Sequence, residues 1–396
     1  MIYTLTGKIQ HYQWGGAHFI PQLLQQPNAA QQPCAEYWLG AHVNAPSLVN
    51  NTTPLTDFFA QQPATLGEKV AADFKRLPYL LKVLDVKDML SIQVHPSRAN
   101  AIKAFAAENE KGIPINAPHR NYKDDNHKPE LMAALSEFYL LHGFRPAKKL
   151  MALLQAIPEL NFLEPVFTKG GYKKLYETVM LMDAAMVTEK LQPLLDRIIP
   201  LYHAGKLEKT HPDFWAARAA ITYNQPGITD RGIFSVYLLN LVRLQPGEGI
   251  FQDAGILHAY LEGQNIEIMA NSDNVLRGGL TPKHIDVAEL MQHVSFTPTE
   301  PAVVHAKSVA AFEKVYKTPA PDFELSVLQL SDGASGTINT GSATILLATK
   351  GAVTVTEADT TLTISAGQAF LATANSRFML EASANTVLYR AAVPVV

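Results

Sequence analysis

The stretch GAVTVTEADTTLTIS (residues 351–365) shows most clearly how this chain folds. Valines alternate with threonines at its start, a turn follows at Glu357 to Asp359, and Leu362 and Ile364 resume the alternation. Because successive side chains of a strand point to opposite faces, the pattern predicts two antiparallel strands joined by a short turn. Similar strand-like segments run from Phe234 to the C-terminus, which is typical of an antiparallel sandwich or jelly roll.

A weak internal repeat connects this stretch with an earlier one. LQPGEGIF (residues 244–251) aligns with ISAGQAFL (residues 364–371), with glycine on glycine and apolar residues at both ends. Eleven residues beyond each glycine stand His258 in the first copy and Phe378 in the second. If the similarity reflects two related β units, only the first can use this position for a metal. Chance similarity is the alternative.

The first part of the chain also contains strand-like pieces. Short apolar runs alternate there with many Pro, Gly and Asn residues, and segments 80–84 and 91–95 are predicted strands. Segments 69–75 and 99–107 have a more helical character.

From about residue 146 to residue 223 the apolar residues recur at helical spacing, as at Leu150, Leu153 and Leu154. Asp213 precedes an alanine-rich run and is in place to cap its helix. We therefore expect a mainly β protein with a helical insertion. The expected units are a first β unit of residues 1–145 and 224–300, the insertion 146–223, and a second β unit of residues 301–396.

Composition places the chain among ordinary globular proteins, with 47% apolar and 17% charged residues in 396. The formal net charge is −3, from 33 basic and 36 acidic residues. Proteins that bind nucleic acid without sequence specificity usually carry a basic excess, so we expect no nucleic-acid partner. An anionic ligand would have to be held by a local group of cations.

Cysteine content and the sequence of the first residues bear on location. Cys34 is the single cysteine, so no internal disulfide and no thiolate-rich zinc site can form. The N-terminal residues show no basic start with an apolar run after it, and no stretch reaches the ~18 apolar residues of a membrane span. We expect a cytoplasmic protein without membrane contact.

Gln93 and His95 form the sharpest local motif. On a strand, residues two apart point to the same face, so these two side chains project together while Ile92 and Val94 point the other way. A strand that holds a ligand inside a barrel would have this arrangement. A strand with one solvated face is the alternative.

Two further segments supply metal-binding side chains. Glu130 leads into the apolar run LMAAL, where a carboxylate is costly to bury unless it is paired or bound to a cation. His258 and Tyr260 share a face of another predicted strand. Taken singly, Glu130 is better explained as a surface glutamate at a strand end, and His258 as a hydrogen-bonded core histidine. Together with Gln93 and His95, however, Glu130 and His258 make a set compatible with one zinc ion.

A polar, glycine-bearing loop follows the His258 strand. Asp273, Arg277 and Lys283 could line the mouth of the same barrel, and arginine can grip a phosphate through two hydrogen bonds. A loop held by an Asp–Arg pair is the alternative. The chain has neither a Walker sequence nor a Gly-x-Gly-x-x-Gly motif, so a nucleotide cofactor is not indicated.

These segments resemble type I mannose-6-phosphate isomerase, also called phosphomannose isomerase, over nearly the whole chain. The resemblance rests on long motifs in order, with mild departures. Gln13 and Tyr37 differ from the residues expected in the family, and Gly278 stands at a position where alanine is frequent. The motifs are YQWGG (12–16), AEYWLGAH (35–42), SIQVHP (91–96), HKPE (127–130), LHAYL (257–261) and MANSDNVLRGGLTPK (269–283).

The resemblance implies two cupin-type β-barrels, the second without metal, and a helical domain inserted in the first. It also implies one Zn²⁺ held by residues matching Gln93, His95, Glu130 and His258, and interconversion of mannose 6-phosphate and fructose 6-phosphate. The implied catalytic residues are Arg277, Lys128, Glu267, Asp273 and Tyr260. The implied substrate and phosphate contacts are Ser91, Lys128, Arg277, Lys283 and Trp14.

On this interpretation Arg277 stabilises developing negative charge, while Lys128 and Lys283 share the phosphate binding and the proton handling. The general base is left open. A metal-containing cupin that only senses a sugar and an isomerase for another sugar phosphate are the alternative functions. We expect a monomer with a small sugar phosphate as its partner.

Overall fold

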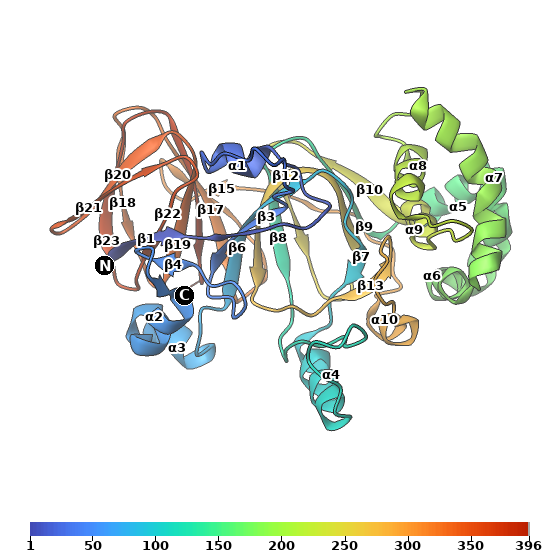
Figure 1. Cartoon of the computed structure of the whole chain (residues 1–396), viewed down its shortest axis with the longest axis horizontal. Coiled ribbons are helices and arrows are strands. Elements are labelled where there is room, and N and C mark those ends of the chain that lie inside the picture. Colours follow the sequence, from blue (N-terminus) through green and yellow to red (C-terminus); the bar gives the residue numbers. More distant parts are fainter. Residues whose placement is uncertain (395–396) are drawn as a thin grey trace.

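The computed structural model describes residues 1–394 and has three regions in a row (Figure 1). The sheets of the C-terminal part lie at one end, the strands that precede and follow the helical region in the sequence lie in the middle, and a group of helices lies at the other end. The prediction of a mainly β protein with a helical region is thereby confirmed.

The middle region is an eleven-stranded antiparallel assembly built around β12 (His258–Ala270). One half of β12 pairs with β6 and β8, and its first residues pair with β7 and β9. This single long strand therefore joins the two parts of the assembly. Its strands are β2 (Lys8–Gln10), β3 (Glu36–Gly40), β6 (Tyr79–Val86), β7 (Ile92–Val94), β8 (Glu130–Ala134), β9 (Phe138–Phe144), β10 (Leu239–Leu244), β11 (Glu248–Gln252), β12, β13 (Leu276–Gly279) and β14 (Val303–His305).

The C-terminal region consists of a nine-stranded and a four-stranded sheet. The predicted hairpin is confirmed, since β20 pairs with β21 from Ala352↔Ser365 to Glu357↔Thr360. The larger sheet contains β1 (Ile2–Thr6), β4 (Leu48–Val49), β5 (Thr53–Pro54), β15 (Lys307–Ser308), β16 (Glu313–Tyr316), β17 (Glu324–Leu330), β19 (Thr344–Lys350), β22 (Ala369–Ala372) and β24 (Thr386–Ala392). The smaller one contains β18 (Ser335–Asn339), β20 (Ala352–Glu357), β21 (Thr360–Ser365) and β23 (Arg377–Ala382).

The N-terminal strand crosses between the regions. β1 pairs with β22, and β4 and β5 extend the same sheet, so residues 2–6, 48–49 and 53–54 belong to the C-terminal region, although 1–145 was expected to lie wholly in the first β unit. Pairing between residues so far apart leaves no local pattern in the sequence. The remaining boundaries of the expected units stay predictions.

The repeat has a structural counterpart in its turn. Gly247 and Gly367 both adopt positive φ, 88° and 85°, and each stands in the short connection between two successive strands, β10 and β11 in the first case and β21 and β22 in the second. Glycine reaches this region without the penalty of a Cβ atom. His258 then begins β12, whereas Phe378 lies buried in β23 among the apolar residues between the two C-terminal sheets.

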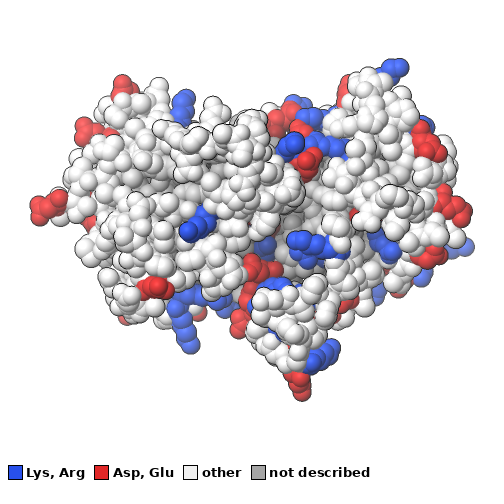
Figure 2. Space-filling view, viewed as in Figure 1, with Lys and Arg blue, Asp and Glu red and all other residues white. Residues whose placement is uncertain are grey.

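The two β regions pack against each other through their apolar faces. Leu81 and Val83 of β6 share one buried cluster with Leu347 of β19 and Leu371 of β22. Over the face seen in Figure 2, Lys and Arg lie beside Asp and Glu, and several of these charges gather in the hollow near the middle.

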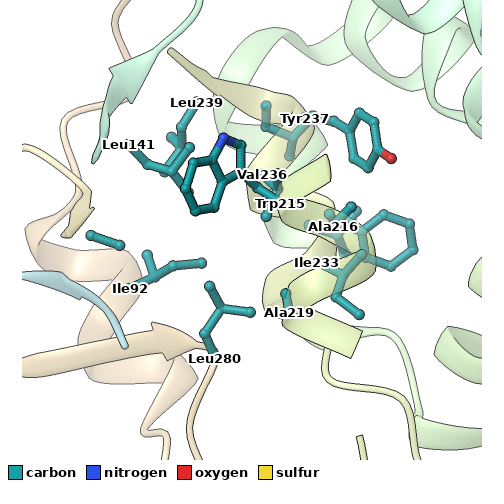
Figure 3. Packing of buried hydrophobic residues seen from close by; sticks show 14 of the residues in the cluster. Ile92, Leu141, Trp215, Ala216, Ala219, Ile233, Val236, Tyr237, Leu239 and Leu280 are labelled. Carbon is teal, nitrogen blue, oxygen red and sulfur yellow. The ribbon is translucent and has the colours of Figure 1, made fainter. Parts of the chain in front are cut away.

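The helical region packs its apolar core onto the middle region. In Figure 3, Trp215 and Ile233 face Leu141, Leu280 and the neighbouring Ile92. The region consists of α5 (Ala147–Ala156), the 3-10 helix Pro158–Leu163, α6 (Glu164–Leu181), α7 (Ala184–His203), α8 (Pro212–Tyr223) and α9 (Gly232–Leu238). The other helices are α1 (Phe19–Leu23), α2 (Leu55–Gln61), the 3-10 helix Pro63–Leu66, α3 (Glu68–Asp73), α4 (Arg98–Glu110) and α10 (Val287–His293). Helices α3 and α4 confirm the helical character of 69–75 and 99–107.

The expected cap of α8 was wrong. His211 precedes Pro212, and its Nδ1 accepts a hydrogen bond from Asp213 N, so His211 is the N-cap and Asp213 lies inside the first turn. Proline at the first helical position needs no hydrogen-bond acceptor, which explains the shift. The Asp213 carboxylate instead accepts a hydrogen bond from Tyr237 Oη at 2.8 Å.

Among residues 1–394, no helix is both long and apolar enough to cross a membrane. Location in the cytoplasm and a monomeric state stay predictions.

The Phe378→Ala variant tests the packing of the second β region. Phe378 is 1% exposed, and its removal should lower the free energy of unfolding by about 3–5 kcal/mol. Met379→Ala is the matched control, because this neighbour is 42% exposed and its truncation should cost less than about 0.5 kcal/mol. Urea denaturation followed by circular dichroism measures both. Equal effects of the two substitutions would contradict the packing.

Candidate metal centre and active site

Strand register brings the predicted metal-binding side chains together. On β7, Gln93 pairs with His258 of β12 on one side and with Arg277 of β13 on the other. Directly opposite residues of adjacent strands point to the same face. Three segments that are far apart in the sequence therefore present one row of polar side chains.

His95, Glu130 and His258 form a compact buried group that could hold a metal ion. One ligand atom from each lies within 4.8 Å of the others. Glu130 Oε1 is 3.3 Å from His95 Nε2, and Glu130 Oε2 is 3.4 Å from His258 Nε2. The carboxylate thus reaches both imidazoles at once.

Backbone carbonyls orient both imidazoles. His95 Nδ1 lies 2.9 Å from the carbonyl oxygen of Asn274, and His258 Nδ1 lies 2.9 Å from that of Ile256. Because a carbonyl oxygen only accepts, each Nδ1 must donate, which leaves a lone pair on each Nε2 of a neutral ring. Burial lowers the pKa of His95 to about 4, so its neutral form is favoured.

The fit of this group to zinc follows from the same geometry. Within residues 1–394 neither Nε2 has a hydrogen-bond partner, and each lone pair faces a carboxylate oxygen. Such an arrangement of acceptors is unfavourable unless a cation lies between them. Two imidazole nitrogens and one carboxylate oxygen are ligands that zinc takes in proteins. Gln93 borders the cavity next to this group, and its part as a fourth ligand stays a prediction.

A cavity of about 760 Å³ extends from Glu130 to the surface. Its volume lies in the usual range for small-molecule sites. Helix α8 contributes Thr222 and Tyr223 to the wall, so the helical region also borders it. The predicted residues that line it are Trp14, Ser91, Gln93, Lys128, Glu130, Tyr260, Glu267, Asp273, Arg277 and Lys283. His95 and His258 are buried beside Glu130.

A second charged group lies at the wall of the cavity; Glu267 and Tyr260 were expected there from the family resemblance, whereas Lys82 and Glu36 were missed from the sequence. Lys82 Nζ is 3.3 Å from Glu36 Oε2 and 3.2 Å from Glu267 Oε2. Trp38 donates its indole N–H to Glu36, and Tyr260 Oη donates to Glu267 Oε1 at 2.9 Å. The sequence does contain an indication of this ion pair. Lys82 and Glu267 each interrupt an apolar strand, where an unpaired charge would be costly to bury.

The electrostatics of this group follow from burial and pairing. Burial opposes a charged ammonium, but the carboxylates of Glu36 and Glu267 outweigh it and raise the pKa of Lys82. Burial raises the pKa of Glu267 above that of an ordinary carboxyl, although Lys82 opposes the shift. Glu267 is therefore a carboxyl group able to exchange a proton nearer to neutral pH.

Asp273 and Lys128 have partners of their own. His42 Nε2 lies 3.1 Å from Asp273 Oδ1, and this contact outweighs burial and lowers the pKa of Asp273. Lys128 Nζ lies 3.3 Å from Glu130 Oε1. His42 was not proposed as a site residue, although it ends a motif that carried the family resemblance.

Arg277 and Lys283 supply positive charge at the cavity. Burial lowers the pKa of both side chains, and the neighbouring Arg277 lowers that of Lys283 further. Two cations held close together and partly out of water bind an anion more strongly than either does alone.

Comparisons with known proteins agree with this geometry. The sequence model of the catalytic domain of type I phosphomannose isomerase matches residues 2–147. Mannose-6-phosphate isomerase of Escherichia coli strain K12 is 37% identical over 385 residues, covering 94% of each chain. This chain belongs to the mannose-6-phosphate isomerase family. The human mannose-6-phosphate isomerase is 32% identical over 386 residues, with 89% of this chain and 88% of the human one covered.

Solved structures of the family share the whole fold. Mannose 6-phosphate isomerase from Salmonella typhimurium, bound to fructose 6-phosphate and zinc, matches with a TM-score of 0.88 and 33% identity over all of both chains. A second family structure, bound with zinc and yttrium, matches equally well. The roles of the individual residues in this chain stay predictions.

Replacing Glu130 tests the metal centre. Glu130→Ala should lower zinc affinity by more than the ~100-fold that is usual for residues which only orient a ligand. Glu267→Gln is the matched control, since Glu267 is an equally buried carboxylate that lies outside the His–Glu–His group and should leave zinc binding intact. Competition with a chromophoric chelator measures both affinities. A Glu130→Ala protein that holds zinc as tightly as the control would exclude Glu130 as a ligand.

Proposed function

We propose that this protein is a zinc-dependent isomerase that interconverts D-mannose 6-phosphate and D-fructose 6-phosphate. The supporting observation is the pair of imidazole lone pairs facing Glu130 beside a cavity that also contains Arg277 and Lys283. A metal site and an anion site in one cavity suit a sugar phosphate. The Salmonella relative binds fructose 6-phosphate and zinc.

The cations of the cavity bind different parts of the substrate. Arg277 and Lys283 hold the phosphate, with Ser91 as a hydroxyl contact at the same cavity. Arg277 also stabilises negative charge that develops on the substrate. Lys128 lies beside Glu130 and reaches the sugar oxygens near the metal centre. Trp14 forms part of the apolar wall.

Aldose–ketose interchange moves one proton between C1 and C2 of the sugar and another between their oxygens. The first transfer needs a group that borders the cavity and gains and loses a proton near neutral pH. Glu267 borders the cavity, burial raises the pKa of its carboxyl, and Lys82 and Tyr260 hold its two oxygens in place. We assign this transfer to Glu267. Asp273, held ionised by His42, is the other carboxylate of the wall.

His95, Glu130 and His258, with Gln93, would hold the zinc ion. When bound, zinc supplies a positive charge that polarises the oxygens of a sugar. The side chains around the cavity orient the sugar and exclude water from it.

The proposal is tested with purified protein and mannose 6-phosphate. Formation of fructose 6-phosphate should be lost on chelation and restored by zinc. Glucose 6-phosphate and unphosphorylated mannose, offered in parallel, report on the substrate. Binding of fructose 6-phosphate without turnover would favour the sugar sensor, and turnover of another sugar phosphate alone would favour the other isomerase.

Arg277→Ala should reduce kcat by about 100–1000-fold, because it removes a charge that stabilises the transition state. Zinc content should stay at one ion per chain, since Arg277 lies outside the His–Glu–His group. Arg243→Ala is the control, as this arginine pairs with Glu137 and does not line the cavity. Steady-state kinetics and metal analysis distinguish the two. Near-normal turnover would remove Arg277 from the mechanism.

Glu267→Gln should reduce kcat by about 100–10,000-fold, the usual contribution of a general acid–base group. The amide keeps the shape of the side chain but cannot take up a proton. Binding of fructose 6-phosphate, followed by calorimetry, should change far less than turnover. A variant that retains most of its kcat would transfer the proton-handling role to another group of the cavity.

A further inference from the structure

The segment 276–283, which carries Arg277 and Lys283, is held in an unusual backbone conformation. Gly279 has φ 129° and Leu280 has φ 53°. A leucine rarely adopts positive φ, and such a residue persists only where its surroundings fix it. The structure therefore has to supply contacts that hold this segment. They come from the helical region.

Asp230, between α8 and α9, binds the segment directly. Its Oδ1 accepts hydrogen bonds from Leu280 N at 2.9 Å and from Gly232 N at 2.7 Å, and its Oδ2 accepts one from Thr281 N at 3.1 Å. Hydrogen bonds to an ionised carboxylate are stronger than neutral ones. Asn224 in turn fixes Asp230, because its Oδ1 accepts from Asp230 N at 3.0 Å.

Tyr176 of α6 supports the other end of the same segment. It is fully buried, and a Cβ atom added to Gly278 would lie only 2.6 Å from its Oη, too close for a real contact. The hydroxyl thus fills the space that Gly278 leaves, next to Arg277. Gly279 and Gly232 approach each other as closely, since a Cβ on Gly279 would meet Gly232 Cα at 2.4 Å.

We propose that Asp230 is a positioning residue for Arg277 and Lys283, and that the helical region thereby sets the geometry of phosphate binding. Leu280 and Thr281 line the cavity, whereas Asp230 does not, so Asp230 acts through the backbone of the segment. Tyr176 and Gly278 fix the end of the segment next to Arg277. The inference rests on the proposed function of the two cations.

Asp230→Asn tests the inference on the full-length, zinc-loaded protein. An amide has one oxygen, so in either orientation at least one backbone N–H faces its NH₂ group instead of an acceptor. Because a small displacement of a binding group can cost about 100-fold, kcat/KM for mannose 6-phosphate should fall by about 10–100-fold, mainly through KM. Zinc content should not change.

Asp183→Ala is the matched control. Asp183 is also an aspartate of the helical region that accepts a backbone N–H, from Met186 at 2.8 Å, but it caps α7 and does not contact the segment. It should lower stability, as the loss of a cap does, and leave KM unchanged. A rise in KM of the same size in Asp183→Ala would mean that general loosening of the helical region is the cause, and would overturn the positioning role.

A second pair of variants tests the Tyr176 contact by rescue. Gly278→Ala should lower kcat/KM because its methyl group meets the Tyr176 hydroxyl. Tyr176→Phe removes that oxygen and leaves room for the methyl group, so the double variant should have a higher kcat/KM than Gly278→Ala alone. A double variant no better than Gly278→Ala would contradict the contact.

Hydrogen exchange of the backbone amides of 276–283, measured without substrate, separates this inference from the proposed function. Faster exchange in Asp230→Asn together with a raised KM supports the positioning role. Faster exchange with unchanged KM and kcat overturns it and leaves the isomerase standing. Exchange equal to that of the parent protein also overturns it. A parent protein without isomerase activity would refute the proposed function, yet faster exchange would still support Asp230 as the residue that holds the segment.

Discussion

The placement of Glu130 is the constraint on which the rest of the site depends. Its carboxylate is buried between two imidazoles. Each Nδ1–H donates a hydrogen bond to a backbone carbonyl, so the lone pair of each Nε2 faces the carboxylate. This arrangement requires β7, β8 and β12 to keep their register, because a slip of one residue would turn every side chain to the other face. The stability of the sheet and the formation of a metal centre are thus linked. A bound cation would strengthen the same strand pairing that creates its site.

The interior of the middle region contains charged side chains beside apolar ones. Near the cavity, Lys82 lies between the carboxylates of Glu36 and Glu267, so its charge is compensated within a few ångströms. Leu84 borders the same cavity and belongs with Phe138 to a buried apolar cluster. Because the pairs are made by adjacent strands, the charges are held in place by the sheet itself. A fixed arrangement of this kind can stabilise charge in a substrate without first having to reorganise.

How much the sequence reveals depends on whether a feature is local. Alternation alone predicted the hairpin at 351–365, and the spacing of Gln93 and His95 placed both on one face, because strand geometry determines these within a few residues. Lys82 was missed because the apolar residues around it indicate only a buried strand, while its partner Glu267 stands far along the chain. The pairing of β1 with β22 was missed for the same reason, because the two strands lie far apart in the sequence. Asp213 was assigned as a cap because the effect of the preceding proline was not considered. The family resemblance supplied the distant partners that local patterns cannot show.

The connectivity of the chain explains why the helical region belongs to the active site and is not a separate appendage. The chain leaves the middle region after β9, forms the helices, and returns through α9 directly into β10, which pairs with β9. Both ends of the insertion are therefore fixed on neighbouring strands, and its core packs on Leu141 and Leu280. From that position α8 borders the cavity, and Asp230 accepts hydrogen bonds from the backbone of Leu280 and Thr281. The cavity beside the His–Glu–His group thus has part of its wall formed by helices that the same chain folds against the β scaffold.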